Sequence, residues 1–386
     1  MKLLRKQSII IFSILALILV ACGGATDESS EEEEVATTEV TETLDSPAVT
    51  TASQVKTGVG ITEEPCPEVI SNIPTGADPT KGCIYLGMLN DYSGPYGAAG
   101  PALDIGQRAF WLWANQTGGI GDYSVAIKEG FDAQYNPQKH LEGYNSLKDE
   151  VAGFSMSLGT PQTQFILENL KEDNLVAVPM SWWSGWAYKD VDASTVIEFG
   201  TQYCADGMNA VDWANENLAT LTGGAIDMKT IGIIGYVTDY GLDFSFGIKQ
   251  AAEAAGIEVA WEYLAPPTEF DVTQAVGLLA TKPVDVYFLA TGLSVAPQIA
   301  GGAAQQGVTS AGMFLGTSYN DAFVAEGSAV KGLFESGLIY AMSFGVAPYE
   351  ADTVGHATMR ATLSQITDSA STFFVGGWAS QYNLKG

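Results

Sequence analysis

Apolar runs alternate with amphipathic stretches along the chain from Cys83 onward. Runs such as "CIYLGML" and "VDVYFLAT" contain almost no polar position, which is typical of strands that are buried on both faces of a parallel sheet. Between these runs, apolar residues recur at helical spacing, first from Pro101 to Asn115. The alternation predicts an α/β fold built from doubly wound parallel sheets.

Local signals place the ends of the expected helices. Asn136 and Thr160 are each followed by proline, which is the pattern of an N-cap with proline at the first helical position. Asp271 is a further N-cap, while Gly256 and Gly307 follow the last apolar positions of two helices. The expected helices run over residues 101–115, 137–149, 160–170, 206–221, 242–255, 271–282 and 296–306.

The length of the chain predicts two lobes. About 320 residues follow the N-terminal segment, which is more than a single core organises well. The strand and helix pattern divides near Gly200, so residues 61–199 are expected to form the first lobe and residues 200–316 the second. Residues 317–386 are then expected to return to the first lobe.

The first residues have the composition of a bacterial export signal. Three basic residues precede an apolar run from Ile9 to Ala21, which is shorter than the roughly 20 residues of a membrane-spanning helix. We therefore interpret residues 1–21 as a signal peptide. The run ends in "LVAC", which resembles a lipobox, so Cys22 is expected to carry a lipid that anchors the protein outside the cell membrane. The alternative is an ordinary signal peptide with an incidental cysteine.

Residues 22–60 are expected to form a disordered acidic tether. The stretch from Thr26 to Gln54 contains nine carboxylates and no aromatic or basic residue, so it cannot offset its ordering entropy. Without these nine carboxylates and the three basic residues of the signal, the formal net charge of −28 becomes about −22. This balance argues against nucleic acid, whose phosphates require a basic surface, and against adsorption to an anionic membrane.

Cysteine usage fits an exported protein, in which disulfides persist. Cys66 and Cys83 bracket a segment rich in proline and glycine, and a disulfide between them would contribute about 3 kcal/mol in the chain-entropy model. Cys204 is then expected to be a buried thiol, although other pairings stay open.

Motifs for catalysis or cofactor binding do not occur in the sequence. It contains no nucleophile elbow, phosphate-binding loop, dinucleotide fingerprint or Cys-x-x-Cys pair. The two histidines, His140 and His356, are interpreted as surface residues on helices. We therefore expect that the protein is not an enzyme and that it needs neither a cofactor nor a metal.

Polar and aromatic loops follow several of the expected strands. They read "NDYSGPYG", "GTPQ", "SWWSGWA", "VTDYG" and "TGLS". In open parallel sheets, ligands bind beyond the carboxyl ends of the strands, and in a two-lobed protein these ends can face each other across a cleft. The tryptophan-rich loop from Ser181 to Ala187 is thus expected to project into such a cleft.

Three ordered motifs resemble type I periplasmic substrate-binding proteins of the branched-chain amino acid transporter class. The opening strand, Ser-Gly-Pro loop and first helix of that family are similar to "IYLGMLNDYSGPYGAAGPALDIGQRAF". Its second lobe is similar to "GYVTDYGLDFSFG" and "EFDVTQAVGLLATKPVDVYFLATG". The resemblance runs from about Cys83 to the end of the chain. It implies two doubly wound lobes, joined by a hinge, that capture a solute for an ABC permease and do no chemistry.

The resemblance also implies a set of ligand-binding residues. Hydroxyl and backbone N–H groups of Leu158 to Thr160 and of Ser181 to Trp183 are expected to hold a ligand carboxylate, which the helix N-terminus at Thr160 would favour. Tyr240 is expected to close over the ligand from the second lobe. Ser93 has an alternative role in its turn. The full expected set is Ser93, Tyr96, Thr160, Ser181, Trp182, Trp183, Tyr240, Thr291, Tyr319 and Asp321.

The sequence departs from that family at two points. Where amino acid binders often carry a glutamate for the α-ammonium, after "VYFLATG", this chain reads "LSVA". An unpaired buried ammonium would cost several kcal/mol, so Asp321 substitutes, the tryptophan faces hold a cation, or the ligand has no amine. The chain also stops at Gly386, before the family pattern completes both lobes, and we expect the C-terminal part of the fold to be missing.

The favoured function is a lipid-anchored receptor that delivers an amino acid, an amide, or a planar or cationic solute to an ABC permease. A ligand-sensing ectodomain for a membrane signalling partner is the first alternative. A surface hydrolase is the second, although the sequence offers no convincing acid–base pair or metal set.

Overall fold

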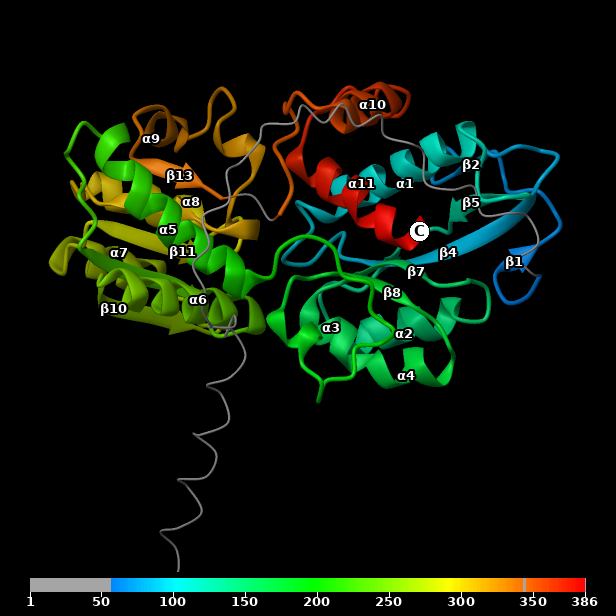
Figure 1. Cartoon of the computed structure of the whole chain (residues 1–386), viewed down its shortest axis with the longest axis horizontal. Helices are drawn as coiled ribbons and strands as arrows, with labels where there is room; N and C mark the ends of the chain where they lie inside the picture. Colours follow the sequence, from blue (N-terminus) through cyan, green and yellow to red (C-terminus); the bar gives the residue numbers. More distant parts are fainter. Residues whose placement is uncertain (1–56, 343–344, 386) are drawn as a thin grey trace, which may run out of the picture. The chain divides into compact units, whose positions relative to one another are not determined.

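The computed structural model describes residues 57–342 and 345–385 (Figure 1). The expected signal peptide, Cys22 and most of the acidic tether lie outside these described residues. All described residues belong to one structural unit, Thr50–Gly386, and this unit contains two larger sheets, each of which defines one lobe.

The first sheet is centred on the long strand β4 (Gly82–Asn90), which is buried along almost its whole length. On one side β4 pairs with β5 (Tyr123–Ile127) and β6 (Phe131–Asp132), and on the other the order continues to β7 (Phe154–Leu158) and β8 (Ala177–Met180). These strands are parallel, and only the short edge strand β1 (Ile61–Thr62) runs antiparallel to β4.

Helices cover both faces of the first sheet. On one face α1 (Gly100–Gln116) packs along α11 (Thr372–Lys385) over the apolar side chains of β4 and β5, and α10 (Val354–Leu363) lies against this pair (Figure 1). On the other face a second core joins α2 (Pro137–Leu147) and α4 (Leu167–Glu172) to the sheet. The C-terminal helices thus belong to the first lobe.

The second sheet contains five parallel strands in the order β10-β9-β11-β12-β13. The strands are β9 (Thr230–Tyr236), β10 (Glu258–Ala265), β11 (Val286–Ala290), β12 (Ala311–Phe314) and β13 (Ile339–Ala341). Helices α5 (Tyr203–Leu221) and α6 (Asp239–Ala255) pack on one face, and α7 (Val272–Thr281) and α8 (Ala296–Gln305) pack on the other. The predicted doubly wound α/β fold is confirmed in both lobes.

Short elements complete the described chain. They are the hairpin β2 (Val69–Ile70) and β3 (Ile73–Pro74), the helices α3 (Thr160–Phe165) and α9 (Lys331–Glu335), and the 3-10 turns η1 (Ser184–Ala187), η2 (Gly316–Ser318) and η3 (Asp321–Phe323). A disulfide joins Cys66 to Cys83 with a Cα–Cα distance of 4.8 Å. Cys204 is buried in the first turn of α5.

Two of the three predicted N-caps are confirmed. Thr160 is instead the first residue of α3, whose N-cap is Gly159 and which has no side-chain cap. The side chain of Asn136 accepts from the backbone N–H groups of Gln138 and Lys139, and Asp271 accepts in the same way from the start of α7. Gly256 ends α6 in the left-handed conformation, with φ of 69°. These confirmed ends are local: each rests on contacts within a few residues of the cap.

Three further expectations need correction. The helix expected from Thr160 to Leu170 is broken at Ile166 into α3 and α4. The second lobe does not end at residue 316, because β13 adds a fifth strand to its sheet; a strand of three residues is too short to leave a readable pattern.

The third correction concerns His140, which is fully buried rather than on the surface. Its Nε2 lies 2.8 Å from the hydroxyl of Ser157 on β7, and burial lowers its pKa to about 3. His140 therefore lies on the inner face of α2, where it stays neutral.

Candidate functional site

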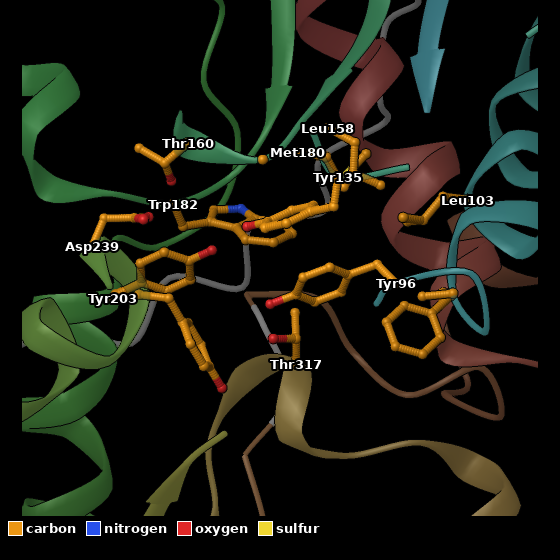
Figure 2. A pocket seen from close by; sticks show the side chains of 14 residues that line it. Tyr96, Leu103, Tyr135, Leu158, Thr160, Met180, Trp182, Tyr203, Asp239 and Thr317 are labelled. Carbon is orange, nitrogen blue, oxygen red and sulfur yellow. The ribbon is translucent and has the colours of Figure 1, made fainter. Parts of the chain in front are cut away.

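A pocket lies between the carboxyl ends of the two sheets and draws its lining from both lobes (Figure 2). We call it the interlobe pocket. Its first-lobe lining is Tyr96, Ala99, Leu103, Tyr135, Leu158, Gly159, Thr160, Met180, Trp182 and Phe373, and its second-lobe lining is Tyr203, Asp239, Tyr240 and Thr317. The lining is predominantly aromatic and aliphatic, with a few polar groups, which is the usual composition of a small-molecule site.

The loop after β4 positions Tyr96. Asp91 is fully buried and accepts from the backbone N–H groups of Gly94 (2.5 Å) and Tyr96 (2.8 Å), which fixes the Ser-Gly-Pro turn. The ring of Tyr96 then packs against Tyr135, from the loop before α2, with 4.7 Å between ring centroids. These two rings form one side of the pocket.

The backbone at Gly159 brings β7 close to the pocket. Gly159 has φ of 101°, a conformation that side chains rarely adopt. A Cβ at this position would lie 2.7 Å from the ring of Tyr135 and 2.2 Å from the amide oxygen of Gln162. Glycine therefore allows Thr160, the next residue, to enter the pocket.

The second-lobe wall is the start of α6. Thr238 caps this helix, so Asp239 and Tyr240 occupy its first turn and both line the pocket. The Tyr240 hydroxyl donates to the carbonyl oxygen of Leu315 (2.7 Å) and lies 3.0 Å from the hydroxyl of Ser318. This hydroxyl is thus held within the second lobe, and the ring of Tyr240 faces the pocket.

Asp239 crosses to the first lobe. Its carboxylate lies close enough to the side chain of Thr160 for this contact to lower its pKa, and the Thr160 hydroxyl is hydrogen-bonded to Ser181. Figure 2 shows Asp239 and Thr160 at the same end of the pocket. Burial raises the pKa of Asp239 above its ordinary value, although the contact with Thr160 acts in the opposite direction. The polar end of the pocket therefore contains a carboxylate in a poorly solvated position.

The aromatic rings of Trp182 and Tyr203 also line the pocket. The ring of Trp182 lies 6.1 Å from that of Tyr203, and Tyr203 lies 5.0 Å from Tyr240 in an edge-to-face arrangement. Trp182 is 3% exposed and Tyr203 is 5% exposed. Figure 2 shows the rings of Tyr96, Tyr135, Trp182 and Tyr203 around one common space.

The structure brings together only part of the site expected from the sequence. Tyr96, Thr160, Trp182 and Tyr240 line the interlobe pocket. Ser93, Ser181, Trp183, Thr291, Tyr319 and Asp321 do not line it. Each of these six has a contact elsewhere that accounts for its position.

In the first lobe, these contacts are to other first-lobe residues outside the pocket surface or behind it. Ser93 is exposed and donates to Asp132 (2.6 Å), which gives it the alternative role in the turn. Ser181 lies behind Thr160 and accepts from the indole N–H of Trp186 at 3.3 Å. Trp183 packs edge-to-face on Trp186, with centroids 5.3 Å apart, over the backbone of Gly185. These residues support the pocket wall without forming its surface.

In the second lobe, the remaining three expected residues belong to the core or to a helix start. Thr291 is fully buried and its backbone N–H donates to Ser318 (2.9 Å). Tyr319 packs on Phe334 with centroids 5.8 Å apart. Asp321 accepts from the backbone N–H and the hydroxyl of Thr372, the first residue of α11. Asp321 is therefore engaged at the start of α11 and does not line the interlobe pocket.

Sequence reasoning missed several lining residues. Asp239 precedes Tyr240 in the motif "VTDYG" and could have been identified from that position. Tyr203 and Phe373 stand at helix starts, and Tyr135 has a positive φ of 51° in an irregular loop. No sequence signal indicates where these three side chains lie.

Among residues 57–342 and 345–385, no group of three or more His, Cys, Asp or Glu side chains could hold a metal ion. Within those same ranges, no helix is both long and apolar enough to cross a membrane.

Comparisons with known proteins agree with this architecture. The family described as periplasmic binding protein matches residues 83–382. No curated protein shows a significant match to the sequence. The structure is similar to a fatty acid ABC transporter substrate-binding protein from Thermomonospora curvata, with 25% identity and a TM-score of 0.66 over 78% of this chain and 74% of that chain.

Two further solved structures share the fold at lower identity. One is a branched-chain amino acid ABC transporter protein from Thermus thermophilus with bound valine, with 12% identity and a TM-score of 0.64 over 78% of this chain and 76% of that chain. The other is a solute-binding protein of an ABC transporter from R. palustris in complex with 4-hydroxybenzoate, with 16% identity and a TM-score of 0.65 over 78% and 79%. The chain therefore belongs to the periplasmic binding protein family, in its type I class.

Proposed function

We propose that this protein captures a small organic solute between its two lobes and presents it to an ABC permease. The observation that carries the proposal is the interlobe pocket. Its walls come from both lobes, and Asp239 of the second lobe lies against Thr160 of the first. A ligand held by both walls stabilises the closed arrangement, because it contacts groups that are separated when the lobes open. A closed protein with bound ligand differs in shape from an empty, open one. A permease can recognise this difference in shape.

The similar proteins support this role. One belongs to a fatty acid ABC transporter, one has bound valine and one is in complex with 4-hydroxybenzoate, and all three solutes are small organic molecules. The family consists of solute-binding proteins, and the interlobe pocket has no histidine or cysteine in its lining. We therefore propose binding and release without a chemical step.

We further propose that the protein is held outside the cell membrane by a lipid on Cys22. The support is the sequence, in which this cysteine directly follows a short apolar run after three basic residues. Replacement of Cys22 by alanine is expected to release the protein from the membrane fraction. Release that does not occur would contradict the anchor without affecting the proposal for the pocket.

Ligand titration tests the solute-binding proposal. Purified protein from residue 23 onward is titrated with amino acids, aromatic acids, fatty acids, amides and amines while tryptophan fluorescence and thermal unfolding are followed. A ligand at a hundredfold excess over its dissociation constant should raise the free energy of unfolding by about 2.7 kcal/mol. If no small solute changes either signal, the protein is not a receptor of this kind.

A further inference from the structure

The interlobe pocket contains one charged side chain and no opposite charge. Of the described residues that line it, Asp239 is acidic, and none is a lysine, arginine or histidine. Carboxylates in poorly solvated positions are usually paired. The positive charge that would pair with Asp239 is thus not provided by the lining of the pocket.

The described groups that line the pocket beside Asp239 or shift its pKa are neutral or acidic. Asp243 lies on the same helix and raises the pKa of Asp239 further, after the larger effect of burial. From the first lobe and from α5, the facing titratable groups are Tyr96, Tyr135 and Tyr203, whose own pKa values are raised mainly by burial and further by the charge of Asp239. These phenols stay neutral at physiological pH, so they do not compensate the carboxylate.

The aromatic walls of the pocket also favour a positively charged ligand. Tyr96, Tyr135, Trp182 and Tyr203 surround the space beside Asp239. The faces of aromatic rings attract cations, and this attraction grows when the site excludes water. A cation that fits between these rings would therefore be favoured both by the rings and by the carboxylate.

We propose that the solute is an organic cation, an alkylammonium or quaternary ammonium compound, whose charge lies between Asp239 and the aromatic rings. This inference rests on the proposed function and specifies its substrate class. The formal net charge of −28 for the whole chain acts in the same direction, since a strongly negative protein attracts cations during diffusion.

An anionic solute does not fit the polar end of this pocket. The hydroxyls expected to hold a ligand carboxylate, on Thr160 and Ser181, are bonded to each other, and Thr160 also lies against Asp239. A second carboxylate there would lie beside Asp239 without a basic partner, and such like-charge contacts cost several kcal/mol. A zwitterionic amino acid would meet the same repulsion at its carboxylate.

Pairs of matched probes test the charge preference. Choline is compared with its neutral analogue 3,3-dimethylbutan-1-ol, and 2-phenylethylamine with 3-phenylpropionate and with phenylalanine, by calorimetric and fluorescence titration. In each comparison, we expect the cation to bind at least about tenfold more tightly than the neutral, anionic or zwitterionic compound. Asp239→Asn keeps the shape of the side chain, and it should weaken cation binding by roughly tenfold to a hundredfold while the neutral analogue changes little.

The control is Asp212→Asn, which removes an exposed carboxylate from α5 outside the pocket. It should leave all affinities unchanged, and thermal unfolding shows that both variants are folded. Cation affinity should also rise with pH through the raised pKa of Asp239, because only its ionised form pairs with the ligand.

The outcomes separate this inference from the proposed function. If an anion or zwitterion binds with a saturating signal and cations do not, or if Asp239→Asn retains full cation affinity, the charge inference is overturned and solute binding stands. If none of the probes and none of the wider solute set binds, both proposals fail.

Discussion

Ser184 and Asp243 are joined by two hydrogen bonds between the lobes. Both the backbone N–H and the hydroxyl of Ser184 donate to the same carboxylate oxygen of Asp243, at 2.8 and 2.7 Å. Ser184 belongs to the tryptophan-rich loop of the first lobe, and Asp243 lies on α6, one turn after Asp239. Asp243 is thus bonded to a hydroxyl of the first lobe and Asp239 lies against another, that of Thr160. We interpret these contacts as a latch that stabilises closure.

The latch predicts a closure defect in Ser184→Ala. The variant keeps the backbone donor but removes a hydrogen bond to a partly buried carboxylate, which costs about 1–2 kcal/mol. We expect ligand dissociation to become roughly 5- to 30-fold faster, with little change in association, as measured by stopped-flow fluorescence. Ser294→Ala, at an exposed position in the second lobe, is the control. An unchanged dissociation rate in Ser184→Ala would show that this contact does not contribute to closure.

The two adjacent tryptophans should respond differently to ligand. Trp182 lines the interlobe pocket, whereas Trp183 packs on Trp186 within its own loop. Trp182→Phe should remove most of the fluorescence change on binding and weaken affinity by about tenfold, because the larger ring surface is lost. Trp183→Phe is the matched control and should keep both the fluorescence change and the affinity. Equal effects in the two variants would contradict this assignment.

The same pair shows what the sequence could and could not predict. The loop and its place after a strand were predictable, because apolar runs and capping residues act within a few positions. Trp183 has an extended backbone, with φ of −70° and ψ of 125°, and neighbouring side chains of an extended chain point to opposite sides. Only one of two such tryptophans can therefore face the pocket, and the tertiary structure decides which.

The remaining differences have a related cause. Tyr203 and Phe373 enter the pocket from helices whose starts are set by contacts between distant segments, such as the bond from the Tyr203 N–H to the Trp182 carbonyl oxygen (2.7 Å). Asp321 has the chemistry of an ammonium partner, but its oxygens are bonded to Thr372. Composition and local pattern identify candidate groups, whereas their direction depends on long-range packing.

The role of Asp321 can be tested through stability. Its carboxylate accepts from the first residue of α11, so it acts as the cap of a helix that packs along α1. We expect Asp321→Ala to lower the free energy of unfolding by about 1–2 kcal/mol, the usual cost of a lost cap. Urea denaturation measures this loss, and Asp368→Ala, an exposed carboxylate nearby in the sequence, is the control. The preference of the pocket for charge should stay the same; a lost preference would return Asp321 to the binding site.

Stability should depend on pH through Asp206 in the first turn of α5. This side chain is 4% exposed, and burial raises its pKa to about 7. The unfolded value is near 4, so the folded state holds the proton more tightly. The cost of burying the charge is absent below pH about 4, grows as pH rises, and is complete above pH about 7.

Replacement by the uncharged isostere should remove that cost. We expect Asp206→Asn to raise the free energy of unfolding by a few kcal/mol at pH 8, and by progressively less at pH 6.5 and pH 5, in urea denaturation at each pH. Asp212→Asn, an exposed position on the same helix, should show no such trend. A gain of equal size at all three pH values would mean that the charge of Asp206 does not oppose folding, because only the ionised side chain carries the cost of burial.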